Sequence, residues 1–365
     1  MHTEKSDLAV ALDVGSQTIK GLVFEITDTG SLLKTHKRIA VQMPSVCTAS
    51  RIVEELHNAL AGVIKEFGRI PAKTIAGFGT SLAEYHVEQW DVEPGVTTRL
   101  GQKDMAEYFG RLFEQHAQED QAMIATPAGI EINGYAISPE VVSRSAGSRA
   151  ARQMSYSLFA LGGTCRDIRF RTVVSYFSSE IGTLLADMKR MLGGVPIEFV
   201  PLASVYREAL AGRLNVRDAL LIDIGGTTTM LVMLKGGLLV QTVSFPLGVS
   251  HIASQELGTK AKIPSKNMAT WSQCFGESLD FLYPFGPLTG ETYLCGGGAH
   301  IRELRSYVEQ GEWLKTLSYT ATPRVIVLEG KSLLADSTVQ GFLQGPEDAG
   351  LASVACYGMH HEVIV

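Results

Sequence analysis

Two short stretches of this chain carry the same residue types in the same order. Residues 12–20 read LDVGSQTIK, and residues 222–229 read IDIGGTTT. In each, an apolar run is followed by aspartate, glycine and hydroxyl side chains. Glycine lets backbone N–H groups approach an anion closely and hydroxyl groups add donors, so each stretch is suited to bind phosphate. Because the pattern occurs twice, we expect two similar domains that bind one ligand from opposite sides.

A third glycine-rich segment, residues 296–298, follows an apolar run and precedes a helical pattern. Such a turn lets the backbone lie flat against a base or a ribose. The candidate nucleotide-binding residues are therefore Asp13, Gly15, Ser16, Gln17, Lys20, Gly225, Gly226, Thr227, Thr228, Gly296, Gly297 and Gly298. The alternative is that these segments are plain hairpin turns and a plain strand-to-helix turn.

Asp13 and Asp223 each stand at the end of an expected strand. Mg²⁺ keeps several waters and uses only one or two carboxylates, so both are candidates to hold Mg²⁺ through water. Lys20 reaches a phosphate as a point charge. His300 lies either near the base or in solvent, and the adjacent His360 and His361 make a poor metal site. No catalytic residue is identified.

The composition excludes several classes of protein. The 365 residues carry a net charge of -6 with no dense basic run, which argues against nucleic acid as a partner. The five scattered cysteines suggest reduced thiols in a cytoplasmic protein. No apolar run approaches the roughly 20 residues of a membrane span.

The expected elements divide the chain into two mixed sheets and an insertion. A helix over 52–67 is expected to be capped by Ser50 and closed by Gly68. The first lobe, with boundaries at 1–82 and 171–215, is expected to hold strands at 8–14, 19–26, 32–42, 74–80, 172–177 and 197–200 and helices at 179–192 and 202–211. The insertion, 83–170, is expected to hold a helix at 102–116 and strands at 122–126, 129–135 and 155–160.

The second lobe is expected over 216–247 and 291–365, with a short nucleotide-covering subdomain at 248–290. Its expected strands are 219–223, 228–234, 238–245, 292–295 and 324–328, and its expected helices are 248–257, 301–309 and 349–359. The turn over 235–237 joins two of the strands.

The three motifs together resemble those of the actin, Hsp70 and sugar-kinase superfamily. Asp13, Gly15, Ser16 and Lys20 are similar to its first phosphate motif, residues 223–228 to its second, and residues 296–301 to its adenosine motif. The resemblance implies an α/β, two-lobed actin-like ATPase fold, built from duplicated ribonuclease-H-like domains, that binds ATP and Mg²⁺.

Within that superfamily the chain resembles FtsA, the bacterial cell-division actin homologue, and next the pilus-assembly protein PilM. The segments similar to FtsA are residues 124–127 and 132–135 of the insertion and residues 201–206. The resemblance implies an FtsA-type inserted subdomain and an ATP-dependent scaffold that polymerises or docks partners. Those partners are a second copy of the chain in a filament or dimer, and an FtsZ-like tubulin homologue or a membrane-protein peptide.

Four departures from the FtsA pattern shape the expectations. Thr227 and Met230 replace a glycine and an aspartate of the second motif, and the subdomain of the second lobe is reduced. Val200 stands where superfamily hydrolases place an acid, so the chain is at most a slow ATPase. No amphipathic membrane helix follows residue 359, so membrane contact is expected through a partner or a missing tail.

Three functions follow from this reading. The first is a cell-division scaffold in the cytoplasm, peripheral to the inner face of the cell membrane. The second is a PilM-like cytoplasmic adaptor of type IV pilus assembly. The third is a small-molecule kinase of the same superfamily, which lacks both the catalytic acid and a substrate pocket signature.

Overall fold

The protein is described here from a computed structural model of the chain. The described residues are 6–27, 32–43, 48–80, 82–91, 122–132, 135–137, 168–177, 179–193, 195–253, 263–287, 290–316, 318–334, 339 and 341–360. The expected helix at 102–116, the expected strand at 155–160 and His361 lie outside them. Among the described residues, no helix combines the length and apolar character that crossing a membrane requires.

The first sheet has five strands in the order β3-β2-β1-β4-β9, with a β-meander followed by two parallel strands. β1 is apolar along most of its length, and Leu8 to Leu12 are all at most 2% exposed because both faces of the sheet are covered. The strands are β1 (Ser6–Val14), β2 (Thr18–Thr27), β3 (Leu32–Gln42), β4 (Lys73–Phe78) and β9 (Ile197–Pro201).

The second sheet repeats this topology in the order β12-β11-β10-β13-β14. A positive φ at Gly236 and Gly237 closes the hairpin between β11 and β12, as the sequence predicts. The strands are β10 (Ala219–Ile224), β11 (Thr229–Lys235), β12 (Leu238–Phe245), β13 (Glu291–Cys295) and β14 (Arg324–Val327). The expected duplication is therefore present, strand for strand.

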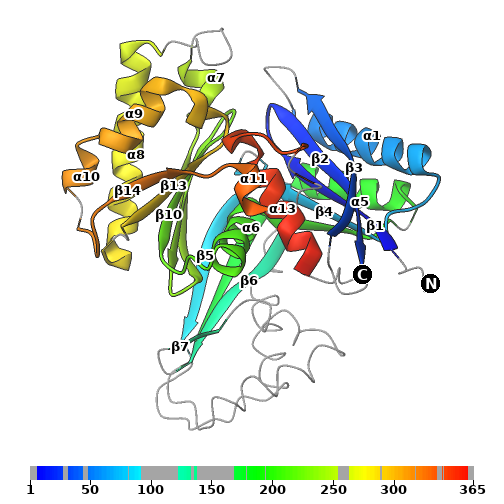
Figure 1. The fold of residues 1–365 in the computed structure, drawn as a ribbon, viewed down its shortest axis with the longest axis horizontal. Helices are drawn as coiled ribbons and strands as arrows, with labels where there is room; N and C mark the ends of the chain where they lie inside the picture. The colour runs from blue at the N-terminus through cyan, green and yellow to red at the C-terminus, as the bar shows by residue number, and fades with distance from the viewer. Residues whose placement is uncertain are drawn as a thin grey trace.

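Helices α1 (Ala49–Phe67) and α5 (Ser179–Met191) pack together beside the first sheet (Figure 1). Gly68 ends α1 in the left-handed conformation, as expected, but the prediction of Ser50 as N-cap is wrong. Thr48 holds that position, and its Oγ1 accepts a hydrogen bond from the N–H of Arg51 at 3.3 Å. Ser50 lies inside the first turn, where its hydroxyl donates to Glu180.

A third, antiparallel sheet has the order β5-β8-β6-β7 and extends away from the other two (Figure 1). The strand that the sequence placed with the first lobe, β8, pairs instead with β5 and β6, a pairing between distant segments that its local pattern does not specify. The strand expected at 122–126 and the 129–132 part of the strand expected at 129–135 form one strand, and Tyr135 belongs to β7. The register of β6 shifts between Pro127 and Gly129, where proline cannot donate. The strands are β5 (Glu84–Asp91), β6 (Ala122–Ile132), β7 (Tyr135–Ile137) and β8 (Ile168–Phe177).

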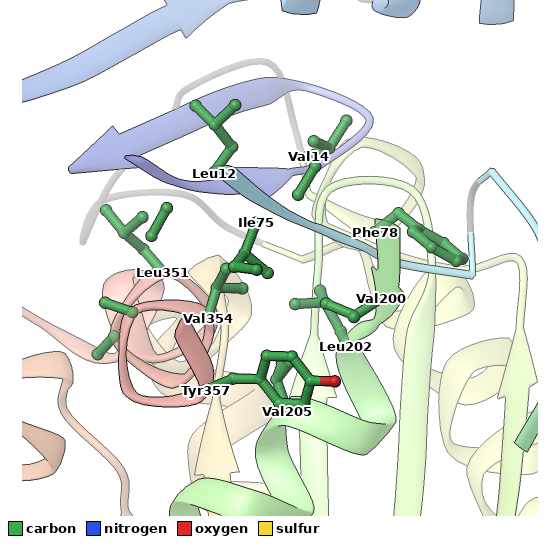
Figure 2. Packing of buried hydrophobic residues seen from close by; sticks show 14 of the residues in the cluster. Leu12, Val14, Ile75, Phe78, Val200, Leu202, Val205, Leu351, Val354 and Tyr357 are labelled. Carbon is green, nitrogen blue, oxygen red and sulfur yellow. The ribbon is translucent and has the colours of Figure 1, made fainter. Parts of the chain in front are cut away.

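Two helices lie between the two large sheets: α6 (Leu202–Arg207) and α13 (Ala349–His360) (Figure 1). α6 continues as a π-helix, η1 (Glu208–Arg213), where a single α-helix was expected. In Figure 2, Leu351 and Val354 of α13 face Leu12 and Ile75 of the first sheet, with α6 close by. The same apolar cluster includes Leu221 and Val232 of the second sheet, so one inner core joins both lobes.

The other face of the second sheet has a separate apolar cluster around Trp271 and Phe275, whose rings stack at 5.1 Å. Gly248 begins a helix as expected, but that helix ends at Ile252, and residues 254–257 lie outside the described part. The remaining helices of this lobe are α7 (Val249–Ile252), α8 (Ser265–Leu282), η2 (Tyr283–Phe285), η3 (Gly297–His300), α9 (Arg302–Gln310), α10 (Trp313–Thr316), α11 (Gly330–Leu333) and η4 (Pro346–Asp348).

Candidate functional site

A cavity of about 540 Å³ opens between the two lobes, where the β1–β2 turn faces the β10–β11 turn. It brings together most of the residues that the sequence selected. Those that line it are Asp13, Gly15, Ser16, Gln17, Lys20, Asp223, Gly225, Gly226, Thr228, Gly296 and Gly297. Thr227 and Gly298 do not line it.

The two turns have the same backbone geometry. The N–H of Gly15 donates to the carbonyl of Thr18 at 3.0 Å, and the N–H of Gly225 donates to the carbonyl of Thr228 at 2.9 Å. Because these N–H groups close their own turns, donors for a bound anion must come from the residues that follow each glycine. Both turns have the local backbone form that phosphate binding requires, and their role as anion sites stays a prediction.

The two turns also contact each other across the cleft. Thr227 Oγ1 donates to Ser16 Oγ at 2.8 Å, and Thr80 Oγ1 donates to Thr228 Oγ1 at 3.2 Å. A Cβ on Gly226 would lie 2.7 Å from the Cγ of Gln17, so a larger residue there would require the Gln17 side chain to move. Thr227 therefore joins the lobes in this structure, and its predicted part in nucleotide binding stays a prediction.

Asp13 and Asp223 lie at the base of the cavity, one from each lobe. Burial raises the pKa of Asp13 to about 6; Lys20 opposes the rise, and Asp223 and Asp348 add to it. Burial also raises the pKa of Asp223, against the lowering effect of Tyr206 and Lys20. Tyr206 donates its hydroxyl to Asp223 Oδ2 at 2.9 Å.

These two carboxylates fit the expected Mg²⁺ site in donor type and number, since Mg²⁺ takes few protein ligands and retains its waters. Their raised pKa values show that their charges are poorly compensated by the protein, and a divalent cation would compensate them. Within the described residues no group of three or more histidine, cysteine, aspartate or glutamate side chains forms a metal cage. The donor set therefore suits a water-mediated cation rather than a tightly coordinated one.

Lys20 lines the cavity, but its ammonium already has protein partners. It donates to the carbonyl oxygen of Glu347 and lies 3.9 Å from Asp348 Oδ1. Arg38 of β3 approaches the same carboxylate oxygen at 2.6 Å. The first lobe thus presents two neighbouring cations, of which the sequence identified only Lys20.

The glycine triplet has three different environments. Gly296 has a φ of 81°, and a Cβ there would lie 2.3 Å from Asp223 Oδ1. Gly298 packs against the side chain of Ile224, which explains why it is absent from the cavity wall. A Cβ on Gly297 would meet nothing within 4 Å, so this residue offers the open backbone surface that a base or ribose requires.

His300 and Glu347 form the wall beside this surface. The Nε2 of His300 and Oε2 of Glu347 lie 2.5 Å apart, and the His300 side chain is 41% exposed. Burial raises the pKa of Glu347, but the hydrogen bonds from His300 and the backbone, together with the charges of His300 and Lys20, lower it by more, so the pKa is lowered. His300 is therefore both near the expected base site and partly in solvent.

The side chain of Val200 lies in the core and is 1% exposed, and its backbone pairs with that of Gly77. Of the described residues that line the cavity, the carboxylates are Asp13, Asp223 and Glu347. None of them replaces the acid that superfamily hydrolases place after this strand, so slow ATP hydrolysis stays a prediction.

Sequence reasoning missed Arg38, Tyr206 and Glu347. Arg38 was detectable in principle, because β3 pairs with β2 and places Ala40 opposite Lys20, so that alternate residues of β3 share a face with Lys20. Tyr206 and Glu347 carry no such signal, since they reach the cavity through the packing of α6 and η4.

Comparison with known proteins finds similarity at the level of structure. No protein-family model matches the chain, and no curated protein sequence does. The structure is similar to that of a PilM-PilN type IV pilus biogenesis complex, with a TM-score of 0.57, 15% sequence identity, and coverage of 96% of this chain and 98% of that one. With the duplicated sheets, this match confirms the expected two-lobed actin-like fold.

Two further matches have TM-scores below 0.5. A protein with actin-like ATPase fold from Bacteroides thetaiotaomicron has a TM-score of 0.42 and 8% identity, with coverage of 88% of this chain and 91% of that one. An inorganic polyphosphate/ATP-glucomannokinase from Arthrobacter sp. strain KM has a TM-score of 0.41 and 16% identity, with coverage of 96% and 98%.

Proposed function

We propose that the chain binds ATP with Mg²⁺ between its lobes and acts as a nucleotide-dependent scaffold. The observation that carries the proposal is the pair of turns closed by the same backbone hydrogen bond, each with a carboxylate beside it, that line one cavity. A plain hairpin turn explains either copy alone. It does not explain why both face one ligand-sized space together with the open backbone of Gly297.

Each wall has a separate part in this function. Backbone N–H groups after Gly15 and Gly225 bind the phosphates, and the hydroxyls of Ser16 and Thr228 add donors. Asp13 and Asp223 would hold Mg²⁺ through its waters, and the ion supplies charge neutralisation to the phosphates. The backbone at Gly297, with His300 beside it, borders the base and ribose.

The scaffold role follows from the placement of these groups on two lobes. A ligand shifts a conformational equilibrium only by its difference in affinity between the two forms. ATP contacts both turns only when the lobes are close, so it favours the closed arrangement and any partner surface that this arrangement presents. With no acid after β9, the bound nucleotide is held rather than rapidly consumed.

For the cellular role we propose a cytoplasmic cell-division scaffold at the inner face of the membrane, which forms filaments or dimers and docks an FtsZ-like protein. The second candidate is an adaptor that captures a peptide from a membrane protein of a type IV pilus. The observation that favours this second role is the structural likeness to the PilM-PilN complex over nearly the whole chain. A small-molecule kinase is the least supported role.

The nucleotide proposal is tested by titration calorimetry with ATP in the presence of Mg²⁺. Asp223→Ala and Gly225→Val are expected to weaken binding at least tenfold while the fold largely persists, because each changes the cavity wall and its immediate contacts, Tyr206 for Asp223 and the Thr228 carbonyl for Gly225. Asp280→Ala is the matched control, since Asp280 is exposed on α8 of the same lobe. Equal affinity in all four proteins would refute the phosphate assignment.

The cellular roles are separated by their partners. ATP-dependent filaments on lipid vesicles, or co-sedimentation with FtsZ, support the first role. Saturable binding of a cytoplasmic peptide from a pilus membrane protein, with no filaments, supports the second. ATP turnover that rises sharply with one added metabolite supports the kinase and refutes both scaffold roles.

A further inference from the structure

The floor of the cleft extends beyond the phosphate turn onto the edge strand of the first sheet. Arg38, Ala40 and Gln42 are alternate residues of β3, and all three line the cavity. Ala40 pairs with Lys20 and Gln42 pairs with Thr18 in the β2–β3 ladder. Side chains two residues apart share one face of a strand, so Arg38 and Lys20 belong to the same polar floor. The small side chain of Ala40 leaves space between them.

Both cations depend on one carboxylate. Asp348 has a side chain with 0% exposure, and its Oδ1 lies 2.6 Å from Arg38 Nη2 and 3.9 Å from Lys20 Nζ. Its second oxygen accepts a hydrogen bond from the N–H of Gln344 at 2.9 Å. One buried carboxylate thus lies close to both cations, which places Arg38 and Lys20 on the same part of the cavity wall.

The guanidinium of Arg38 also has unused donors. Arginine carries five N–H donors, and the Nε of Arg38 is buried with no hydrogen-bond partner among the described residues. An unpartnered buried donor is costly, and it is expected to find an acceptor in the functional state. The Nε itself is buried, but the Arg38 side chain as a whole is 26% exposed and lines the cavity, so a ligand there can reach the guanidinium.

We propose that Arg38 is a second anion-binding residue of the cleft and binds the phosphate tail of the nucleotide together with Lys20. Asp348 is the positioning residue that orients both cations. The inference rests on the proposed nucleotide function and extends it. The planar fork of arginine matches a phosphate group with two parallel hydrogen bonds, which a lysine cannot do.

A simpler reading is that the Arg38–Asp348 pair only ties β3 to the start of α13. The two readings predict different ligand dependence. Loss of a structural contact weakens the binding of all ligands of the cleft alike, because the whole cavity becomes less ordered. Loss of a phosphate ligand weakens only those molecules that carry phosphate.

The test compares Arg38→Gln with Lys37→Gln. Lys37 is the neighbouring residue on the same strand, and it is exposed and pairs with Glu66 on the helix-covered side. The charge change is identical. Calorimetric titrations with Mg-ATP, inorganic tripolyphosphate and adenosine are run on both variants and on the wild type at one ionic strength.

For Arg38→Gln we expect ATP and tripolyphosphate to bind about ten- to a hundredfold more weakly, as for loss of a hydrogen-bonded charge, with adenosine affinity unchanged. Lys37→Gln is expected to bind all three within about twofold of the wild type, as for an exposed charge. Arg38→Lys keeps the charge beside Asp348 and therefore the fold, but lacks the fork, so its ATP affinity is expected to lie between those of the wild type and Arg38→Gln.

Two results on the variants overturn the inference. One is ATP and tripolyphosphate affinity in Arg38→Gln equal to that in Lys37→Gln. The other is a parallel loss for ATP and adenosine in both Arg38 variants, which identifies the residue as a structural tie. A wild-type protein that binds none of the three ligands refutes the proposed nucleotide function, and the inference falls with it.

Discussion

Replacing Asp13 by asparagine is expected to stabilise the ligand-free protein at neutral pH while abolishing its response to Mg-ATP. The carboxyl lies between the lobes beside Asp223 and Asp348, and its pKa rises from 3.8 to about 6 in the folded protein. The unfolded chain has no such environment, and its Asp13 ionises near the ordinary value. Asparagine has nearly the same shape and no charge.

The sign of the effect follows from proton binding. Between pH 3.8 and about 6 the folded state holds more protons on Asp13 than the unfolded state does. The favourable contribution of this residue is therefore complete below pH 3.8 and is lost as the pH rises through about 6. A shift of roughly two units corresponds to about 3 kcal/mol, since one unit is worth about 1.36 kcal/mol. This is the largest gain that Asp13→Asn is expected to give at pH 7.5.

The assay is urea unfolding of the wild type and Asp13→Asn at pH 4.5 and pH 7.5, with and without Mg-ATP. The difference in unfolding free energy between the two proteins isolates Asp13, because all other titrating groups are common to both. That difference should favour the variant more at pH 7.5. With ATP at about a hundred times its Kd, the wild type should gain about 2.7 kcal/mol and the variant little.

Asp280→Asn on the exposed side of α8 is the control and should behave as the wild type in all conditions. If Asp13→Asn and the wild type differ equally at both pH values, the carboxyl has no raised pKa and the electrostatic reasoning is wrong. If the variant gains as much stability from Mg-ATP as the wild type, Asp13 takes no part in binding.

Three further substitutions test other parts of the structure. Tyr206→Phe removes the donor to Asp223 and should weaken Mg²⁺-dependent ATP binding about tenfold in calorimetry, as for loss of a hydrogen bond to a charge. The control is Tyr357→Phe, which should show no such loss because the hydroxyl of Tyr357 donates to Glu198 instead. Gly296→Ala places a Cβ 2.3 Å from Asp223 Oδ1 at a φ of 81°. Urea unfolding should show that the free energy of unfolding falls by about 2 kcal/mol or more. An unchanged midpoint would contradict this turn geometry. Gly62→Ala lies at an exposed position in α1 with nothing within 4 Å of the added Cβ; thermal unfolding should show a gain of about 0.5–1 kcal/mol from helix propensity, and a loss would mean that the helix is strained there.

The turn residues of the site were predictable because their chemistry is local. Asp13, Gly15 and Gly225 indicate a strand end and a turn within a few residues, and the repeat of the pattern predicts that the turns face each other. The same local signals located β1, β2 and β3 closely, and Gly68 marked the end of α1.

The missed features depend on packing between distant segments. Asp348 meets Arg38 and Lys20 only because η4 leads back from the second lobe to the first. The local pattern of β8 does not say which sheet the strand joins, because its partners β5 and β6 come from distant segments. Domain boundaries likewise depend on packing between distant segments, so the boundaries that the sequence suggests stay a prediction.

The inner apolar cluster, to which Leu12, Ile75, Leu221 and Val232 all contribute together with α13, has a consequence for how the molecule loses its structure. If one lobe unfolded alone, apolar side chains of the other lobe would be exposed to water. The two lobes are therefore expected to unfold in one cooperative step. A fragment of the chain that contains only one lobe is not expected to fold stably on its own. Opening and closing of the cleft must therefore rearrange a hydrophobic core that both lobes share, and it cannot be a hinge motion between two independently folded domains.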